Sequence, residues 1–136
     1  IPWSLTSIAG MPLSNYLNGV RNKTSNPPEF DFAEIEKDVH TSGAEVIRLK
    51  GATYYAIALS ARRICECILR DTNTVVTLSG MLHGEYGIED VCLSLPFILN
   101  GSGLHNTEMP ELPSEELDKL LLSANTLKST IASLDI

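Results

Sequence analysis

A four-residue link between two helical patterns is the feature that most restricts how this chain can fold. From Asp31 to residue 50, apolar residues recur at the three- and four-residue spacing of an amphipathic helix, and Asp31 can cap it. A second broad apolar face follows Thr53, which is a suitable cap, and continues to Ile68. Gly51, a residue that helix ends prefer, lies in the link. The short joint of residues 50–53 therefore fixes how the second helix leaves the first.

The segments after the second helix have the alternation of half-buried strands. Residues 75–81 predict one strand, and residues 91–97 alternate between apolar and other side chains as a second strand should. Pro96 favours an edge position or a bulge for the second strand. The sequence Asn-Gly-Ser-Gly at residues 100–103 predicts a turn, after which residues 104–109 return as a partner strand. These segments predict an antiparallel unit.

The remaining segments complete the fold class. Residues 1–9 predict a short strand leading into a turn, and residues 18–28, rich in Asn, Ser, Gly and Pro, predict a mobile loop. Ser114 can cap a long final helix with an apolar stripe. Helices combined with sequence-adjacent strands predict an α+β fold, taken as one domain over residues 1–136. No Gly-rich phosphate loop follows a strand, so a Rossmann domain is absent and this segment alone should bind no dinucleotide.

Charge and cysteine usage restrict the partners. The net charge of −7, with scattered Lys and Arg, argues against nucleic acid. No window approaches the roughly 20 apolar residues of a membrane span, and no signal peptide is seen at the start. Cys65 and Cys67 point to different sides of their helix, so we expect reduced thiols and a cytoplasmic location. The chain opens on Ile1 rather than Met, so we expect further sequence upstream.

No residue pattern completes a catalytic or metal centre. His40, His83 and His105 lack partners at a recognisable spacing, although His83 lies in a loop-like segment. Acidic pairs such as residues 115–116 are explained by helix capping. The sequence therefore nominates no catalytic residue and no metal ligand in this chain.

Residues 47–58, with the sequence IRLKGATYYAIA, closely resemble the lactate dehydrogenase family. Residues 2–4 with 8–10, residues 86–91 (YGIEDV) and residues 95–101 follow in the order and spacing of that family's C-terminal half. The resemblance implies the C-terminal, substrate-side domain of an NAD-dependent L-lactate (L-2-hydroxy-acid) dehydrogenase, with antiparallel strands and long helices. Such a two-domain cytoplasmic enzyme of glycolysis interconverts 2-keto and L-2-hydroxy acids and assembles as a dimer or tetramer.

The resemblance also implies roles for particular residues. Thr53 matches a threonine that lines the substrate site, and Ile57 matches an aliphatic cofactor-binding residue against the nicotinamide face. Gly43 and Ala44 match positions near the substrate side chain, where many lactate enzymes carry alanine and tyrosine. Their smaller size suggests a wider pocket that accepts longer 2-keto acids.

The groups that perform the family's chemistry belong upstream of Ile1. They are the proton-donating histidine, its aspartate and the substrate-binding arginines, so we expect the isolated chain to be inactive and to bind no NAD. Two alternatives remain open: the C-terminal domain of a malate dehydrogenase, which shares the architecture, and a non-catalytic assembly module. The sequence of residues 51–57 is closer to lactate enzymes, and the helix of residues 31–50 is the expected subunit contact.

Overall fold

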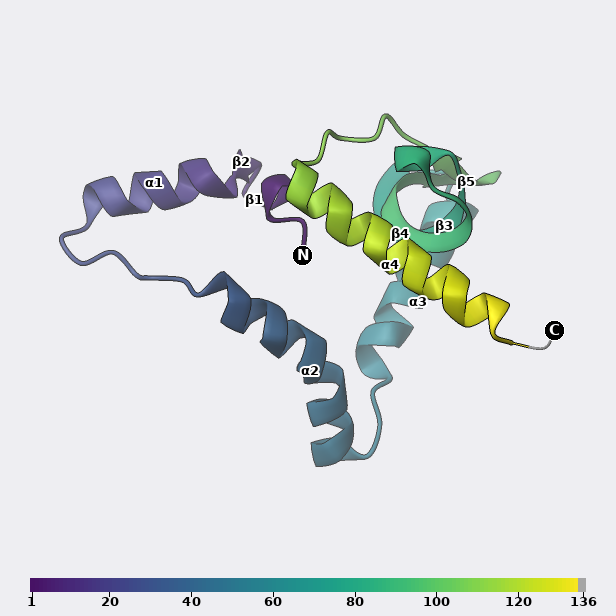
Figure 1. Cartoon of the computed structure of the whole chain (residues 1–136), viewed down its shortest axis with the longest axis horizontal. Helices are drawn as coiled ribbons and strands as arrows, with labels where there is room; N and C mark the ends of the chain where they lie inside the picture. The colour runs from purple at the N-terminus through teal and green to yellow at the C-terminus, as the bar shows by residue number, and fades with distance from the viewer. Residues whose placement is uncertain (135–136) are drawn as a thin grey trace. The chain divides into compact units, whose positions relative to one another are not determined.

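The structure is a computed structural model that describes residues 1–134, and Figure 1 shows the order of its elements. The chain divides into two compact units: unit 1 comprises residues 1–61, and unit 2 begins at Arg62. Helix α3 (Tyr55–Leu69) contributes to both units. The helices and the antiparallel strands confirm the α+β prediction.

Unit 1 begins with small elements that the sequence pattern did not resolve. A 3₁₀ turn η1 (Trp3–Leu5) precedes strands β1 (Ser7–Ile8) and β2 (Met11–Pro12), which pair antiparallel. Ala9 and Gly10 join them with φ angles of 51° and 80°, the positive values that a two-residue hairpin turn requires. The short strand expected in residues 1–9 is therefore one arm of a tight hairpin.

Helix α1 (Leu13–Lys23) corrects the prediction of a loop that starts at Asn18. Its apolar residues Leu13, Tyr16, Leu17 and Val20 follow helical spacing, and this pattern outweighs the Asn and Gly residues between them. A helix tolerates such residues at a cost of about 1 kcal/mol each or less. The irregular segment is consequently shorter than expected, and it lies between α1 and α2.

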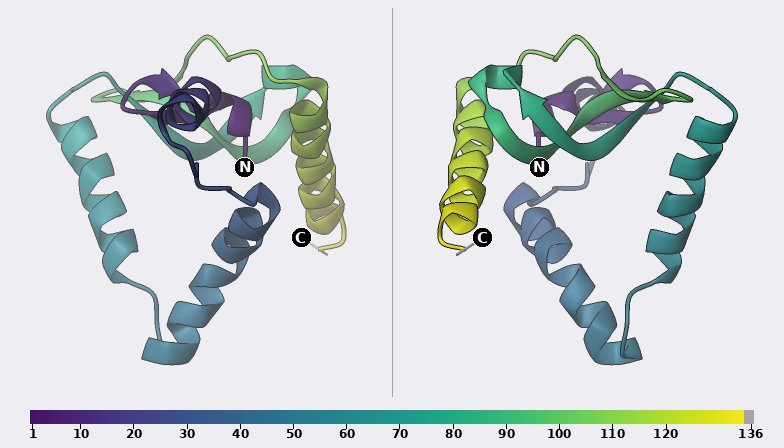
Figure 2. Two further views of the ribbon diagram at one scale, coloured as in Figure 1. Left: turned by 90° about the vertical axis from the view of Figure 1, so that its left-hand side faces the viewer. Right: turned by 90° about the vertical axis from the view of Figure 1, so that its right-hand side faces the viewer.

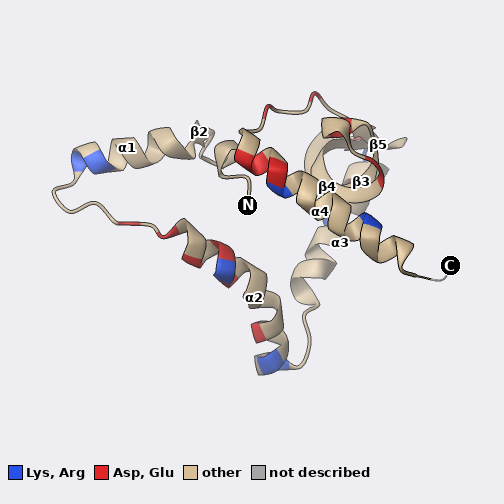
Figure 3. Cartoon of the chain, in the orientation of Figure 1, with Lys and Arg blue, Asp and Glu red and all other residues tan. Residues whose placement is uncertain are grey.

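Helix α2 (Phe32–Lys50) has the ends that the sequence predicted. The Asp31 carboxylate accepts hydrogen bonds from the backbone N–H groups of Ala33 and Glu34 at 2.9 and 3.0 Å. Gly51 closes the helix in the left-handed conformation with φ of 83°, and its N–H donates to the Ile47 carbonyl. Figure 3 shows acidic residues near the start of α2 and basic residues at its end, the distribution that the helix dipole favours.

Unit 2 is built on a three-stranded antiparallel sheet with the order β3-β4-β5. Its strands are β3 (Thr74–His83), β4 (Glu89–Asn100) and β5 (Gly103–Asn106), and helix α4 (Ser114–Ala132) runs alongside β4 (Figure 2). A small 3₁₀ turn η2 (Glu85–Gly87) connects β3 to β4. The core is formed by inward positions of β3 and β4, by Ile88 just before β4 and by one alanine of α4: Leu82, Ile88, Val91, Leu93, Leu95, Phe97 and Ala124. The alternation predicted for residues 91–97 is confirmed.

Pro96 is not in an edge strand, because β4 is the centre of the sheet. It faces Thr77 of β3, while β5 pairs only with Phe97 and the residues after it. The Pro96 carbonyl accepts a hydrogen bond from the Thr107 hydroxyl at 3.3 Å, so this side of the residue faces chain beyond the end of β5. The missing N–H faces the same side and therefore removes no bond from either ladder.

Candidate functional site

The candidate site is the joint between α2 and α3, where the sequence placed its strongest motif. Residues 51–54 connect the two helices without regular structure, and Gly51 supplies the reversal. The Lys50 ammonium lies 4.1 Å from the centre of the Tyr55 ring and 5.0 Å from that of Tyr54. The two ring centres are 4.5 Å apart and tilted by 55°. The joint is thus a tight turn over which one cation contacts two aromatic rings.

Thr53 lies in this joint, half-buried, two residues before the first residue of α3. The prediction that Thr53 caps α3 is wrong, because the Tyr54 carbonyl accepts the first helical hydrogen bond, from the Ala58 N–H at 2.9 Å. Among residues 1–134 the Thr53 hydroxyl has no hydrogen-bond partner. The first N–H groups of an α-helix also lack helical partners and carry partial positive charge. The joint therefore places a free hydroxyl beside donors that suit a small oxyanion.

Ile57 is in the first turn of α3, four residues after Thr53, and 63% of its surface is exposed. Residues four apart lie on the same face of a helix, although Thr53 itself precedes the helical turns. The exposed side chain offers an apolar surface in the first turn after the joint. A flat, uncharged ring could pack against such a surface.

Gly43 and Ala44 lie in the middle of α2, where both are exposed. A methyl group added at Gly43 would meet no atom within 4 Å, so open space adjoins this position. The residues predicted for the site thus share one continuous stretch, residues 43–57, on both sides of the joint. Gly43 and Ala44 lie more than one helical turn from the joint. Gly43, Ala44 and Ile57 are exposed to solvent, and Thr53 is half-buried.

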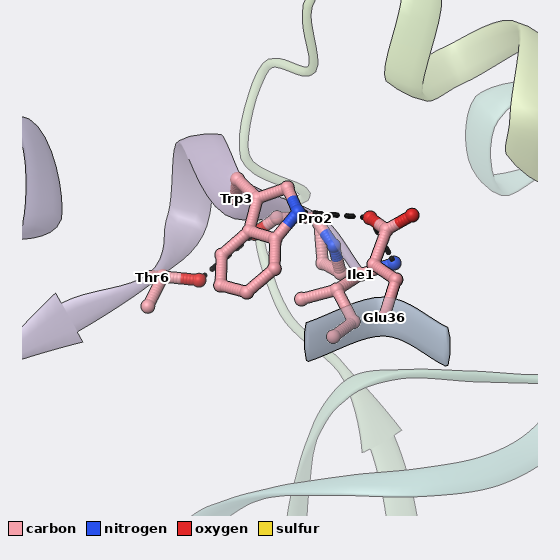
Figure 4. Close-up of polar contacts among 5 residues, drawn as sticks. All are labelled: Ile1, Pro2, Trp3, Thr6 and Glu36. Carbon is pink, nitrogen blue, oxygen red and sulfur yellow. Dashed lines mark hydrogen bonds and ion pairs between the residues drawn. The ribbon is translucent and has the colours of Figure 1, made fainter. Parts of the chain in front are cut away.

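A polar contact that the sequence did not predict anchors the start of the chain to α2 (Figure 4). The Trp3 indole N–H donates to the Glu36 carboxylate at 2.8 Å, and the Trp3 ring lies 4.7 Å from the Phe32 ring. The Ile1 nitrogen also lies 3.4 Å from the same Glu36 oxygen. Phe32 and Glu36 are one helical turn apart and therefore lie on the same face of α2. This spacing was the only feature of the sequence that indicated that both could contact the same side chain. The Trp3 side chain is thus held on the first turns of α2.

Unit 2 contains two polar clusters at its turns. His105 Nε2 lies 2.9 Å from the Ser102 hydroxyl and 3.1 Å from Asn100 Oδ1, so this histidine has partners that the sequence reading did not foresee. The Glu85 carboxylate accepts a hydrogen bond from the His83 backbone N–H at 2.6 Å, and this bond lowers the pKa of Glu85 below its ordinary value. Both clusters are exposed, and their hydrogen bonds stabilise the turns at the ends of the strands.

Two residues in unit 2 have shifted pKa values, in opposite directions and for different reasons. The Cys67 side chain is fully buried, and its contact with the Thr72 hydroxyl lowers the pKa of the thiol. Desolvation raises the pKa of Tyr86, whose hydroxyl donates to the Pro110 carbonyl at 2.6 Å. Within the described part of the chain, no group of three or more His, Cys, Asp or Glu side chains could hold a metal ion. No helix in residues 1–134 is long and apolar enough to cross a membrane.

Comparison with known proteins relates this chain to the lactate and malate dehydrogenases. Residues 2–135 match the family model described as lactate/malate dehydrogenase, alpha/beta C-terminal domain. The chain is 41% identical over 134 residues to an L-lactate dehydrogenase of Acetivibrio thermocellus, covering 98% of this chain and 41% of that protein. It therefore spans about two fifths of the length of this relative.

Solved structures agree with this match. The L-lactate dehydrogenase from Clostridium thermocellum superposes with a TM-score of 0.79 at 37% identity, covering 99% of this chain and 42% of that one. The malate dehydrogenase from Archaeoglobus fulgidus, solved in complex with NADH, gives a TM-score of 0.74 at 32% identity, covering 86% of this chain and 40% of that one. The fold is thus shared by lactate and malate enzymes.

Proposed function

Because this chain belongs to the lactate/malate dehydrogenase C-terminal-domain family, we propose that it is the substrate-side part of an NAD-dependent L-lactate dehydrogenase. The reaction interconverts pyruvate-like 2-keto acids and L-2-hydroxy acids. The observation that carries the proposal is the α2–α3 joint, where the unpaired Thr53 hydroxyl precedes the N-terminus of α3. We take residues 1–136 as one substrate and oligomerisation domain in the assembled enzyme.

Thr53 is the proposed contact for the substrate. A 2-keto acid is a small anion, and a helix N-terminus favours negative charge through its free N–H groups and its dipole. The hydroxyl adds one hydrogen-bond donor or acceptor at the position where the substrate would enter. This role needs a hydroxyl group that makes no hydrogen bond within the fold, and the Thr53 hydroxyl makes none among the described residues.

Ile57 is the proposed contact for the cofactor. NAD supplies and accepts the hydride, and an apolar surface disfavours the charged oxidised ring relative to the neutral reduced one. The exposed Ile57 side chain fits the face of a nicotinamide ring, whereas the chain has no Gly-rich loop for the phosphates. We therefore propose that the nucleotide-binding half lies upstream and that this segment alone does not bind NAD.

Gly43 and Ala44 are proposed to widen the substrate pocket. The space beside Gly43 is open, and a side chain missing from a pocket wall leaves room for a longer substrate. One methylene in a hydrophobic pocket changes discrimination by about 1–3 kcal/mol. We therefore expect the enzyme to accept branched or longer 2-keto acids in addition to pyruvate.

The catalytic histidine, its aspartate and the substrate-binding arginines are proposed to lie upstream, so the isolated segment is inactive. The exposed apolar side chains of α2 and α3 are proposed to be covered in a cytoplasmic homo-oligomer, a dimer or tetramer. They include Val39, Val46, Ile47, Leu49 and Leu59.

The test is steady-state kinetics of the full-length protein with NADH and three 2-keto acids: pyruvate, 2-ketoisocaproate and oxaloacetate. We expect turnover of pyruvate, and a KM that rises when Thr53→Val removes the hydroxyl at nearly constant volume. Thr41→Val is the matched control, because the Thr41 hydroxyl is occupied by the Lys37 carbonyl at 3.0 Å on the exposed surface of α2.

The possible outcomes separate the candidates. Absence of turnover with all three acids contradicts the enzyme proposal and favours an assembly module. A preference for pyruvate over 2-ketoisocaproate above about a thousandfold contradicts the widened pocket, since it exceeds what one or two methylenes provide. Preferential use of oxaloacetate identifies the second candidate, a malate dehydrogenase, which the match to the Archaeoglobus fulgidus enzyme supports.

A further inference from the structure

Lys50 connects the two sides of the α2–α3 joint through its side chain. It is the last residue of α2, and its ammonium lies over the rings of Tyr54 and Tyr55, which stand on either side of the boundary where α3 begins. Both distances, 5.0 and 4.1 Å, are within the range of about 6 Å in which a cation is attracted to an aromatic face. The cation therefore bridges the turn that contains Thr53.

The geometry of the joint depends on such local contacts, because few other contacts among residues 1–134 fix it. Helix α2 has no buried residue, and residues 55–63 of α3 are exposed as well. At the turn, the Gly51 N–H also donates a hydrogen bond to the Ile47 carbonyl at 2.7 Å. This bond ends α2 and makes no connection to α3.

We propose that Lys50 is a positioning residue for the 2-keto acid site. By holding the Tyr54 and Tyr55 rings against the end of α2, the ammonium fixes the direction in which the joint presents the Thr53 hydroxyl and the first turn of α3. Lys50 acts through Thr53 and does not touch substrate. The inference rests on the proposed function, because it assigns a role within that same site.

A simpler role for Lys50 is that of a cation at the C-terminus of a helix. Lys50 and Arg48 both lie in the last turn of α2, where positive charge interacts favourably with the helix dipole. That role requires only the charge and is indifferent to the aromatic rings. The two roles therefore predict different KM values for a variant that lacks a tyrosine ring and keeps Lys50.

The test uses the full-length enzyme and compares Lys50→Met, Lys50→Arg and Lys37→Met. Methionine keeps the length of the side chain without the charge, and arginine keeps the attraction to aromatic rings. Lys37→Met removes the same charge from an exposed position of the same helix. We expect Lys50→Met to raise the KM for the 2-keto acid about 2- to 5-fold with a smaller change in kcat, as the loss of an exposed cation–π contact allows.

We expect Lys50→Arg to restore the wild-type KM and Lys37→Met to leave it unchanged. Equal KM values for Lys50→Met and Lys37→Met overturn the proposal. If the wild-type enzyme turns over no 2-keto acid, the proposed function itself fails. A wild-type enzyme that is active while Lys50→Met leaves its KM unchanged overturns only the role of Lys50.

A second pair of variants tests the contact from the aromatic side, and it remains informative if Lys50→Met does not fold. Tyr55→Phe keeps the ring and removes the hydroxyl, whereas Tyr55→Leu removes the ring. We expect Tyr55→Phe to match the wild type and Tyr55→Leu to raise the KM, by no more than Lys50→Met does because the Tyr54 contact remains. The double variant should have the KM of Lys50→Met alone. Additive effects, or a Tyr55→Leu enzyme with the wild-type KM, assign Lys50 to the helix dipole instead.

Discussion

Replacing Leu82 by alanine tests whether the core of unit 2 is packed as described. Leu82 lies in β3 with 0% of its surface exposed, among Ile88, Val91 and the other core residues. The substitution removes three carbons, and at about 0.8 kcal/mol for each the lost transfer free energy is about 2.4 kcal/mol. A cavity that the neighbours cannot fill raises the expected loss of unfolding free energy to between about 3 and 5 kcal/mol.

The matched control is Leu122→Ala on α4 in the same unit, where 66% of the leucine is exposed. The same atoms are removed there from a surface that is already in water, so we expect a change below about 0.5 kcal/mol. Urea unfolding of the purified chain, followed by far-ultraviolet circular dichroism, measures both values. A loss below about 1 kcal/mol for Leu82→Ala, or equal losses for both variants, would refute the assigned core.

Further predictions concern packing, capping, pH and local stability. Gly80→Ala should lower stability by about 1–3 kcal/mol in urea titrations, because the new methyl would lie 3.2 Å from the buried Phe97 ring as well as 2.5 Å from Leu104 Cδ2. Gly19→Ala in α1 meets nothing within 4 Å and should not be destabilising. Asp31→Ala should cost about 0.5–2 kcal/mol and reduce helicity, while Asp31→Asn keeps most of the cap; equal losses would contradict the capping bond. The lowered pKa of Glu85 contributes stability above the ordinary carboxyl pKa, and this is lost as pH falls through the folded-state pKa. The unfolding midpoints of the wild type and Glu85→Gln should therefore converge in acid, and a constant difference would count against this. Hydrogen exchange should be faster at α2 amides than at those of β4, because α2 has no buried side chain, and the reverse order would contradict that assignment.

The parts of the fold that could be predicted from sequence are those specified by local signals. Asp31 and Gly51 mark the two ends of α2 through hydrogen bonds to the neighbouring backbone, so their effect needs no distant partner. The alternation of residues 91–97 likewise fixes which face of β4 is buried. These predictions depend on residues within one or two turns of each other, and the structure confirms them.

The wrong predictions concern residues whose local sequence is compatible with more than one structure. Gly19 and the asparagines around it favour turns in isolation, but the apolar spacing of α1 decides for a helix. Pro96 excludes a ladder hydrogen bond on one side only, and the length of β5 determines whether that side is paired. A threonine before a helix resembles a cap, yet Thr53 lies one residue too early to act as one. In each case the deciding information is the position of another segment.

The candidate site was partly accessible from sequence. The motif at residues 51–57 located the joint, and the structure places Thr53 and Ile57 at its α3 side. The contacts of Lys50 with the two tyrosines and of Trp3 with Glu36 were not foreseen. They depend on side-chain directions at a turn and on a separation of 33 residues, and neither is encoded in a short periodic pattern.

The buried core and the predicted site residues lie in different units. The core of unit 2 is formed by its own strands and α4, so its elements are supported by burial within the chain. The predicted site residues lie instead on α2, the joint and the start of α3, where most apolar side chains are exposed. An amphipathic helix gains most of its stability from packing of its apolar face, so α2 needs a partner surface. If the proposed assembly supplies that surface, the contacts that order α2 and α3 also order Thr53 and Ile57, and formation of the substrate site becomes coupled to assembly.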